Sequence, residues 1–589
     1  MRIVDSRRLT GPSLLLDGPG AILDVELSGI DPARAIAAWR LELESLLEAI
    51  GWGGASVATR AHAQGVSLAF GAPLDTLYAA TEVNEAAWHA AARRLGGAET
   101  ARDRRPQAAE AEDAAGDGDA SPDLESVAAG LKAAIERERN PRLLELARAA
   151  AHHGVTILWD DRRVSVGLGS GSRVWPLDQT PRVMDRIRWG SLRDVPTALV
   201  TGTNGKSTTV RLLGAIAAAA GRVAGVTSTD RVTVGEEVVA IGDYSGPNGA
   251  RTVLRDRRVE VAMLELARGG ILRRGLAVPR ARVALVTNVA NDHLGEFGIF
   301  DLPALADTKM VVAKAVGPEG RVVLNADDPL LLERGARLAV PVLWFTLDPA
   351  HPTVAAHLAR GGEACLVKDG ALVFARGAER HVVTRVDQVP LTFAGAARHN
   401  VANALAAIGV ATALELPLEA IASGLQGFES TPALNPGRAN VWKLGDATAI
   451  VDFAHNPHGL EALAQMAANL PARRRAIVIG QAGDRDDDAI REFVREAWDM
   501  RPDRVFIKEM EVYLRGRELG VIPALIERTF RELGASPEQI EHHAEEYDAA
   551  QSNAQHQSLR QGPHASSPAR RLARQCRRVT VWFPLLRRP

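Results

Sequence analysis

The sequence predicts a multidomain α/β protein with a small N-terminal α+β domain, a central P-loop-type domain and a C-terminal Rossmann-like domain. Three observations predict this class. At 589 residues the chain is too long for a single hydrophobic core. Its 46% hydrophobic and 24% charged residues are typical of a globular protein and exclude global disorder. From about Val195, apolar β-rich runs alternate with helical or glycine-rich segments, as in a mostly parallel sheet covered by helices.

The domain organisation follows from changes in composition along the chain. Apolar residues recur every three or four positions in 36–52, which predicts a helix in the N-terminal domain. Residues 101–122 contain no large apolar side chain, so this stretch cannot offset its ordering entropy and is expected to be flexible. We expect an N-terminal domain, a flexible linker, a helical connecting segment, a central domain, a C-terminal domain and an atypical basic tail at 1–98, 99–122, 123–190, 191–430, 431–550 and 551–589.

The strands and the first helix of the two larger domains are predicted by their apolar patterns. Residues 207–221 read as a helix closed by Gly221. Buried strands are expected in the central domain at 197–202, 222–226, 260–266, 283–289 and 320–325. The runs at 448–454, 475–480 and 504–509 predict strands of the C-terminal domain.

The tail differs in composition from the rest of the chain. Residues 551–589 contain eight arginines and no acidic residue. Their Arg, Ser, Pro and Ala bias is typical of a GC-rich gene read in the wrong frame, so we expect an origin by frameshift or truncation. A genuine basic arm that holds nucleic acid or an acidic partner is the alternative. Residues 579–586 are apolar enough to add an edge strand.

Composition also excludes several classes of function. No uncharged apolar run reaches eighteen residues, and the first residues lack the apolar run of a signal peptide, so we expect a cytoplasmic protein without a membrane span. Cys365 and Cys576 are too few for a disulfide framework or a four-thiolate zinc site. A net charge of −2 gives no whole-chain footprint for nucleic acid, and no nucleic-acid partner is expected.

A candidate phosphate-binding loop lies between a predicted strand and a predicted helix. Glycines at such a turn let backbone N–H groups surround phosphate oxygens, and the helix N-terminus favours negative charge. Lys206 is expected to reach the terminal phosphates and Ser207 to offer its hydroxyl to Mg²⁺. Val200 stands where the standard pattern has another glycine, so the loop is a shortened variant, and a chance turn is the alternative. The expected nucleotide-binding residues of this loop are Gly202, Thr203, Asn204, Gly205, Lys206, Ser207 and Thr208.

Several motifs in order resemble the Mur ligase superfamily of ATP-dependent amide ligases. After the loop come the sequences NVANDHL (288–294) and RHNVANA (398–404). The sequences GDYSGPNGAR (242–251), LELARGGILRRGL (264–276) and DFAHNPHG (452–459) resemble the ligase half of the cyanophycin synthetase branch. That branch carries an ATP-grasp domain ahead of its P-loop, for which this chain has no room. The resemblance implies that any reaction here uses the Mur-type site alone.

The resemblance implies a magnesium site and a modified lysine. Ser207, Glu265 and His293 are expected to complete the magnesium shell, and Lys309 falls where many Mur ligases have a carbamylated lysine that helps hold a second Mg²⁺. From residue type alone, Glu265 is equally well an ordinary glutamate at a strand end, and His293 a structural histidine. An exposed helix lysine is the alternative for Lys309, and Lys314 is another candidate carrier of the carbamate.

Further residues are assigned roles by the same resemblance. Asn400 is expected to contact adenine, with a helix cap as the alternative. Arg438 is expected to reach the phosphates from the C-terminal domain, and Asp452 and His455 to line the inter-domain nucleotide site as catalytic residues. The acidic loop at 480–492 is expected to face the incoming amino acid, where its acids suit a cationic side chain; a solvated acidic turn is the alternative.

The expected function is an ATP- and Mg²⁺-dependent amide ligase that works through an acyl phosphate. The resemblance implies that it joins arginine, or a similar amino acid, to an aspartate side-chain carboxylate of a peptide or polymer. Two alternatives stay open: a catalytically weak nucleotide-binding paralogue that assists a full-length synthetase, and a Mur-type ligase with a different substrate. A homo-oligomer or an association with such a synthetase is also left open.

Overall fold

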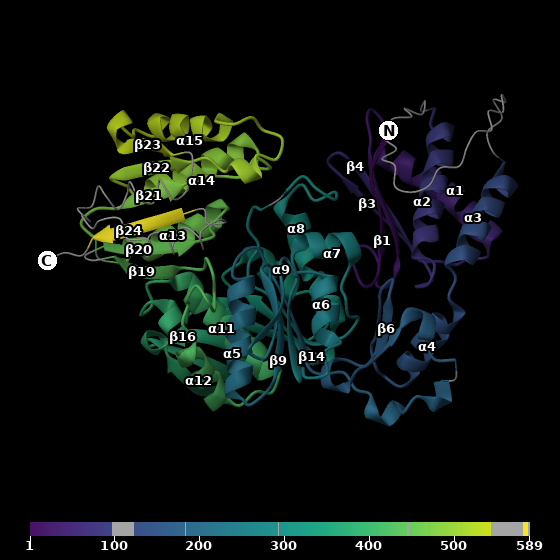
Figure 1. Cartoon of the computed structure of the whole chain (residues 1–589), viewed down its shortest axis with the longest axis horizontal. Coiled ribbons are helices and arrows are strands. Elements are labelled where there is room, and N and C mark those ends of the chain that lie inside the picture. The colour runs from purple at the N-terminus through teal and green to yellow at the C-terminus, as the bar shows by residue number, and fades with distance from the viewer. Residues whose placement is uncertain are drawn as a thin grey trace.

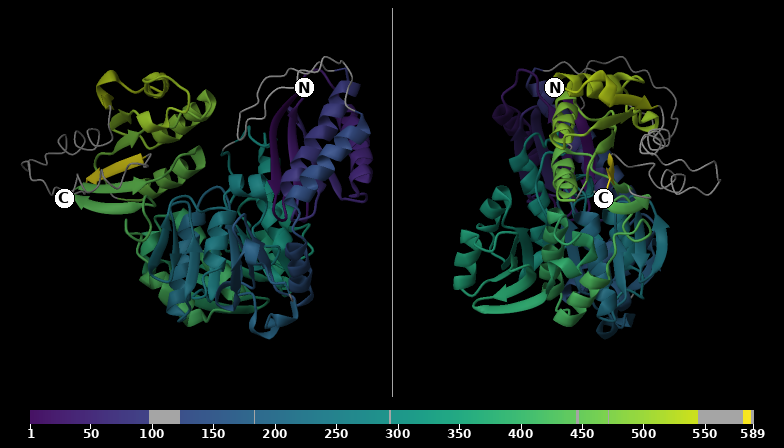
Figure 2. Two further views of the ribbon diagram at one scale, coloured as in Figure 1. Left: turned by 45° about the vertical axis from the view of Figure 1, so that its right-hand side comes forward. Right: turned by 90° about the vertical axis from the view of Figure 1, so that its left-hand side faces the viewer.

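The computed structural model describes residues 1–96, 123–182, 184–292, 294–444, 447–470, 472–543 and 581–586. Three larger units follow one another along the chain. In Figure 1 and in the left view of Figure 2, the first and last units stand above the central one, to its right and left. The expected flexible linker lies outside the described residues, as does His293. No helix of the described segments is long and apolar enough to cross a membrane.

The N-terminal unit is a four-stranded antiparallel sheet covered by helices, which agrees with an α+β fold. Trp39, Leu43 and Leu47 of one helix are buried against the sheet at helical spacing. The helix α3, which sequence places in the connecting segment, buries Leu131 and Ile135 in the same core. The strands and helices are β1 (Arg2–Leu9), β2 (Gly20–Glu26), α1 (Pro32–Ile50), β3 (Val57–His62), β4 (Gly65–Gly71), α2 (Leu77–Arg94) and α3 (Leu124–Glu138).

A short connecting region leads into the central unit. It contains α4 (Pro141–His152) and a three-stranded antiparallel sheet of β5 (Ile157–Trp159), β6 (Arg163–Val166) and β7 (Arg173–Pro176). Arg255 of the central unit is buried against this sheet, where it pairs with Asp160 and bonds the Ser165 hydroxyl. The region is thereby fixed to the central unit.

The central unit is an eleven-stranded sheet in the order β11-β10-β9-β12-β8-β13-β14-β15-β16-β17-β18. Strands β9 to β16 in this order pair in parallel, as the sequence predicts, and antiparallel strands extend both edges. The strands are β8 (Thr197–Thr201), β9 (Ala224–Thr227), β10 (Arg231–Val234), β11 (Glu237–Ile241), β12 (Val261–Glu265), β13 (Ala281–Val286), β14 (Val316–Asn325), β15 (Val342–Thr346), β16 (Glu363–Lys368), β17 (Ala371–Arg376) and β18 (Glu379–Arg385).

Helices cover this sheet on both faces, with a separate hydrophobic cluster under each. Because the middle strands are buried on both sides, they read as continuous apolar runs rather than alternating ones. The helices are α5 (Lys206–Ala219), α6 (Pro247–Leu254), α7 (Arg268–Arg274), α8 (Leu302–Met310), α9 (Pro329–Gly335), α10 (Pro352–Ala359), α11 (Arg398–Ala413) and α12 (Leu418–Gly427).

The C-terminal unit is a six-stranded sheet in the order β19-β20-β24-β21-β22-β23. The expectation of an edge strand at 579–586 is wrong, because β24 lies between β20 and β21 and pairs antiparallel with both. The frameshift origin of the tail stays a prediction. The elements are β19 (Asn440–Leu444), β20 (Ala447–Asp452), α13 (Pro457–Ala468), β21 (Ala476–Ile479), α14 (Asp487–Asp499), β22 (Arg504–Lys508), α15 (Val521–Glu532), β23 (Ile540–His543) and β24 (Val581–Leu586).

Candidate active site

A cavity of about 2130 Å³ lies where the three units meet. Its floor is the carboxyl edge of the central parallel strands, where β8, β12 and β13 end side by side. Ligands of open α/β sheets bind at this edge, because the strand-to-helix loops converge there. Arg8 of β1 and Arg438 of the C-terminal unit also line the cavity, so all three units contribute to its wall.

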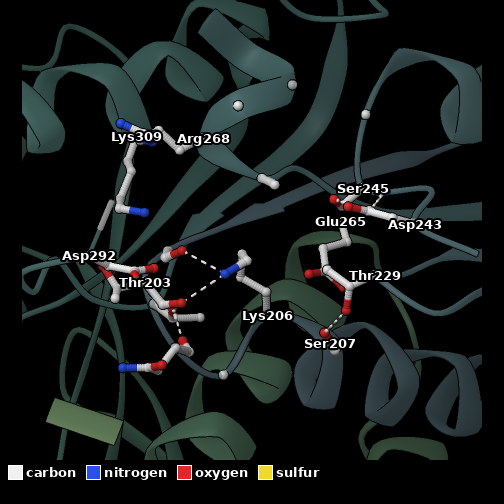
Figure 3. Close-up of a pocket in the computed structure, with 18 of the residues that line it drawn as sticks. Thr203, Lys206, Ser207, Thr229, Asp243, Ser245, Glu265, Arg268, Asp292 and Lys309 are labelled. Carbon is white, nitrogen blue, oxygen red and sulfur yellow. Dashed lines mark hydrogen bonds between the residues drawn. The ribbon is translucent and has the colours of Figure 1, made fainter. Parts of the chain in front are cut away.

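The loop from Gly202 to Gly205 has the backbone that the sequence predicts for a phosphate-binding turn. It joins β8 to α5, and Gly205 has a left-handed φ of 87° that favours glycine. A Cβ atom on Gly205 would stand 2.3 Å from Oδ1 of Asn403. The ammonium of Lys206 donates to the Gly202 and Thr203 carbonyls at 2.9 and 2.8 Å, as Figure 3 shows. The lysine therefore lies folded against its own loop.

Lys206 faces two carboxylates across the cavity. Burial lowers the pKa of Lys206, while the negative charges of Glu265 and Asp292 oppose that shift. Glu265, at the end of β12, is 1% exposed, and burial raises its pKa against the opposing charge of Lys206. Among the described residues neither Glu265 oxygen has a hydrogen-bond partner of good geometry, although the nearby Ser207 hydroxyl also opposes the rise in the Glu265 pKa. A buried, unsatisfied carboxylate beside a phosphate loop is suited to a cation.

The residues around Glu265 fit a magnesium ion bound mainly by nucleotide and water. The Ser207 hydroxyl lies 3.2 Å from that of Thr229, on the same side of the cavity as Glu265 (Figure 3). No group of three or more His, Cys, Asp or Glu side chains in the described segments has the geometry of a metal site. Mg²⁺ is commonly held by one or two carboxylates together with substrate phosphates, so one buried glutamate with hydroxyls suffices.

Lys309 lies inside the protein, so the alternative of an exposed helix lysine is wrong. Its side chain is 3% exposed and lines the cavity from α8. Burial, followed by the positive charge of Lys206, lowers the pKa of Lys309 well below its ordinary value. Lys314, the other candidate carrier, forms a 2.8 Å ion pair with exposed Asp17 and does not line the cavity. Of the two candidate lysines, Lys309 is therefore the one that lines the cavity.

His399 and Asn400 lie in the first turn of α11. The Asn400 amide donates to the Leu391 carbonyl at 3.1 Å and accepts from Asn403 at the same distance. Burial lowers the pKa of His399 to about 4, so this ring is neutral at physiological pH. Both residues line the cavity, but the Asn400 side chain already has protein partners for its donor and its acceptor.

Asp452 organises the backbone around Arg438. One of its carboxylate oxygens accepts the Ala439 N–H and the other accepts the Ala454 N–H, each at 2.7 Å. Burial raises the pKa of Asp452, and the nearby charge of Arg438 opposes the rise. The Arg438 guanidinium lies 4.9 Å above the Phe453 ring. Asp452 thus holds the segment that carries Arg438 at the cavity wall.

Side chains of the C-terminal unit contact the central unit directly. Asn204 and Asn456 exchange two side-chain hydrogen bonds of 3.1 and 3.2 Å. Asp292 forms a 2.9 Å ion pair with Arg485, and the His455 ring lies 3.9 Å from the same carboxylate oxygen. Burial lowers the pKa of His455 to about 4. These contacts bring the predicted residues of both units together around the phosphate loop.

Most acidic residues of the loop at 480–492 form ion pairs or hydrogen bonds with neighbouring protein groups. Asp487 pairs with Arg517 at 2.6 Å, and Asp488 pairs with Arg491 at 2.8 Å. Asp486 accepts the Ala489 N–H at the start of α14. Asp484 lines the cavity, so one acid of this loop is placed to meet a ligand.

Two site residues were given no role from sequence: Asp292 and Arg268. Asp292 directly precedes His293 in the sequence. The motif that assigned a role to the histidine could therefore also have indicated the aspartate. Arg268 follows the carboxyl end of β12, where the topology rule for parallel sheets places functional side chains. Its guanidinium bonds Glu296 at 2.6 Å and lines the cavity.

Two family models match the central and C-terminal units. The Mur ligase middle domain matches residues 200–411. The Mur ligase glutamate ligase domain matches residues 437–561. These two domains belong to the Mur ligase family. The Mur ligase match reaches eleven residues beyond the expected end of the C-terminal domain at 550, into the basic tail.

Within the Mur ligase family, the chain is similar to proteins with different substrates. It is 40% identical over 334 residues to a cyanophycin synthetase of Trichormus variabilis, which covers 57% of this chain and 37% of that protein. It is 29% identical over 307 residues to the UDP-N-acetylmuramoyl-L-alanyl-D-glutamate–2,6-diaminopimelate ligase of Geobacter metallireducens, over 50% of this chain and 56% of that enzyme. The matched part is thus little more than a third of the cyanophycin synthetase.

A solved structure of the bifunctional folylpolyglutamate synthase/dihydrofolate synthase of Yersinia pestis is also similar. It is 22% identical, covers 61% of this chain and 84% of that chain, and superposes with a TM-score of 0.45.

Proposed function

We propose that this Mur ligase family member is an ATP- and Mg²⁺-dependent amide ligase that joins arginine, or a similar cationic amino acid, to an aspartate side-chain carboxylate. The observation that carries the proposal is the juxtaposition of Lys206, the unsatisfied Glu265 carboxylate and buried Lys309 in one cavity. Positive charge, a cation-binding carboxylate and room for a second reactant are the parts that phosphoryl transfer requires. The likeness to cyanophycin synthetases supports the choice of substrates.

The proposed reaction has two steps. An acceptor carboxylate oxygen attacks the γ-phosphorus of ATP, ADP leaves, and the carboxylate becomes an acyl phosphate. The amine of the second substrate then attacks the carbonyl carbon, phosphate leaves with the bonding electrons, and the nitrogen loses a proton. Activation is required because a carboxylate does not react with an amine in water.

The residues of the chain act in this reaction by positioning and by neutralising charge. Lys206 leaves its carbonyl partners to contact the terminal phosphates, and the loop N–H groups surround them. Ser207 and Glu265 would hold Mg²⁺, with His293 as a further candidate from the sequence. Bound Mg²⁺ neutralises phosphate charge and orients the phosphate oxygens. Lys309, once carbamylated, would present a carboxylate-like group in place of a cation at the same wall.

The C-terminal domain would bind the second substrate and form part of the nucleotide site. Arg438, held at the wall by the Asp452 carboxylate, is placed to contact phosphate oxygens. Asp484 faces the cavity from the acidic loop, and a carboxylate there suits the guanidinium of an incoming arginine. Asn400 would contact adenine through atoms not engaged with Leu391 and Asn403.

The test is ADP release measured with an aspartate polymer or with β-aspartyl-arginine oligomers, with and without arginine, followed by mass spectrometry of the product. The expected result is arginine-dependent ADP release and a product heavier by one arginine less water. ADP release without arginine dependence, or with diaminopimelate instead, would assign a different Mur-type substrate. Nucleotide binding without turnover under every condition would favour a paralogue that assists a full-length synthetase.

A further inference from the structure

Two segments of the central unit that carry cavity residues also contact the N-terminal unit. The first follows β12 and forms α7, with Glu265 and Arg268 at the cavity. The second follows β13 and contains Asp292 at the cavity and then a tight turn at 295–299. Glu265 and Asp292 are the two carboxylates whose charges oppose the shift of the Lys206 pKa. The positions of these two segments therefore set the charge around the phosphate loop.

The turn at 295–299 has a backbone that needs support from its surroundings. The Gly295 N–H donates to the Ile299 carbonyl at 2.8 Å and closes the turn. Phe297 has a left-handed φ of 53°, which is uncommon for a bulky residue, and Gly298 follows with a φ of 72°. Such a conformation persists only where neighbouring contacts hold it. The contacts of this turn with the N-terminal unit are therefore important for its shape.

Strands β3 and β4 of the N-terminal unit supply contacts of this kind. Nη1 of Arg60 donates to the Gly298 carbonyl at 3.0 Å. A Cβ atom on Gly298 would stand 2.8 Å from the His62 ring and 3.0 Å from the Ser67 hydroxyl. The His62 ring centre also lies 5.3 Å from that of Phe300, just after the turn. The backbone of the turn thus lies directly against the N-terminal sheet.

Arg7 of β1 contacts both segments at once. It is 6% exposed, its Nε donates to the Leu272 carbonyl of α7 at 2.8 Å, and its guanidinium lies 4.8 Å from the Phe297 ring centre. Asp24 of β2 pairs with the same guanidinium and accepts the Ser67 hydroxyl. Because the guanidinium is planar and is held by an acid of its own sheet, it fixes α7 and the turn relative to that sheet.

Helix α7 connects the N-terminal unit to the cavity through its two ends. At its C-terminal end the Thr10 N–H donates to the Arg274 carbonyl at 2.8 Å, where the chain leaves β1. At its first position Arg268 pairs with Glu296 of the turn at 2.6 Å, and both residues line the cavity. The helix, the turn and the N-terminal sheet therefore form one connected support for the cavity.

We propose that the N-terminal unit holds the Glu265 and Asp292 segments in the arrangement that binds Mg²⁺ together with nucleotide, with Arg60 and Arg7 as positioning residues. Neither arginine lines the cavity, so each acts through a segment that it contacts. The matched Mur ligase domains begin at residue 200, so this role belongs to a part of the chain outside them. The inference rests on the metal–nucleotide site of the proposed function.

The experiment measures nucleotide binding by the full chain separately from turnover. Isothermal titration calorimetry with ADP is carried out at saturating Mg²⁺ and without Mg²⁺. Arg60→Ala should weaken ADP binding in the presence of Mg²⁺ roughly tenfold, the effect of one lost charged hydrogen bond, and change binding without Mg²⁺ much less. Arg60→Lys keeps a donor and should restore most of the affinity. Arg2→Ala is the matched control, because Arg2 pairs with Glu26 on the surface of the same unit.

A second variant tests the same contact from the other side. Gly298→Ala places a methyl group against His62 at a left-handed position and should weaken Mg²⁺-dependent binding in the same direction. Thermal unfolding curves show whether each variant is folded. In hydrogen exchange, both variants should exchange faster in peptides that cover 294–300 and remain unchanged over 197–219, which contains the phosphate loop. In turnover assays Arg60→Ala should raise the KM for ATP with Mg²⁺ and leave that for arginine unchanged.

The outcomes distinguish failure of this inference from failure of the proposed ligase. Mg²⁺-dependent binding that is equal in Arg60→Ala, Gly298→Ala and the unaltered chain would overturn the positioning role and retain the ligase. An equal loss with and without Mg²⁺, or an equal loss in Arg2→Ala, would also overturn it. Arg60-dependent binding without arginine-dependent ADP release would retain the positioning role and remove the ligase assignment. Absence of Mg²⁺-dependent binding by the unaltered chain would remove both.

Discussion

Asn204 and Asn456 hold the phosphate loop and the C-terminal domain together through a reciprocal pair of amide hydrogen bonds, 3.1 and 3.2 Å long. The same Asn456 oxygen accepts the Gly459 N–H and caps α13. One side chain therefore both begins a helix of one domain and contacts the nucleotide loop of another.

Replacement Asn456→Asp separates these two roles. Aspartate keeps the acceptor that caps α13 but cannot donate to the Asn204 oxygen. We expect the free energy of unfolding to change little, while kcat/KM for ATP falls roughly fivefold for the loss of about 1 kcal/mol. Asn456→Ala, which removes the cap as well, should also lower stability. Unchanged ATP kinetics in the aspartate variant would contradict a functional contact.

Lys206→Ala should reduce ADP formation to below about one per cent of the unaltered chain, since loss of a charge-stabilising donor typically costs a hundredfold or more. Phosphate release assays at saturating ATP measure the effect. Lys314→Ala is the matched control, because Lys314 pairs with exposed Asp17 outside the cavity. Turnover near the original level in Lys206→Ala would remove the loop from the mechanism.

Asp452→Ala should lower both stability and activity, but activity more. Two backbone N–H groups, those of Ala439 and Ala454, lose their acceptor, at an expected cost of about 2 kcal/mol in the free energy of unfolding. Amide formation should fall further, because the Arg438 segment is no longer held at the cavity wall. Urea unfolding and activity per folded molecule are compared. Loss of stability with unchanged specific activity would make Asp452 purely structural.

Removal of dissolved CO₂ should lower ligase activity, and added bicarbonate should restore it, if Lys309 is carbamylated. The neutral amine attacks the carbon of CO₂ and loses a proton, which converts the buried amine into an anion. With ¹³C-labelled bicarbonate, a carbamate signal in the carbon NMR spectrum should appear and be absent from Lys309→Ala. Activity that is insensitive to CO₂, together with no such signal, would leave Lys309 as an unmodified buried amine.

Cys365 should resist thiol reagents until the central sheet opens. Its side chain is 0% exposed on β16, and burial raises the pKa of the thiol, so little reactive thiolate forms. In a Cys576→Ser background, labelling by a chromogenic disulfide should require denaturant, and its midpoint should coincide with loss of helical circular dichroism. Rapid labelling under native conditions would mean that this part of the sheet opens locally.

Features that depend on residues adjacent in the sequence could be predicted. The strand at Thr197–Thr201, the glycine turn and the helix from Lys206 form one contiguous pattern, so the loop and its lysine could be located directly. The buried position of Lys309 could not be predicted, because a lysine on a helix is usually exposed and its burial depends on packing against other segments. The two backbone bonds of Asp452 likewise depend on the fold of the loop around it.

Features assembled from distant segments were beyond sequence reasoning. Arg8 of β1, Arg251 of α6 and Arg274 of α7 line one cavity, although these elements are far apart along the chain. No local pattern indicates that Arg8 and Arg274 lie at one cavity. The internal position of β24 was mispredicted for a related reason: strand order depends on pairing between remote segments, and an apolar run alone does not specify it.

The position of β24 has a consequence for how the C-terminal domain is assembled during synthesis. Strands β20 and β21 are made early, yet β24, which separates them in the sheet, is synthesised far later. Until that segment emerges, both strands present unpaired backbone edges, the kind of surface on which chains misassociate. The nascent domain is open to edge-to-edge association until then, and a chain that ended before β24 would keep both edges unpaired.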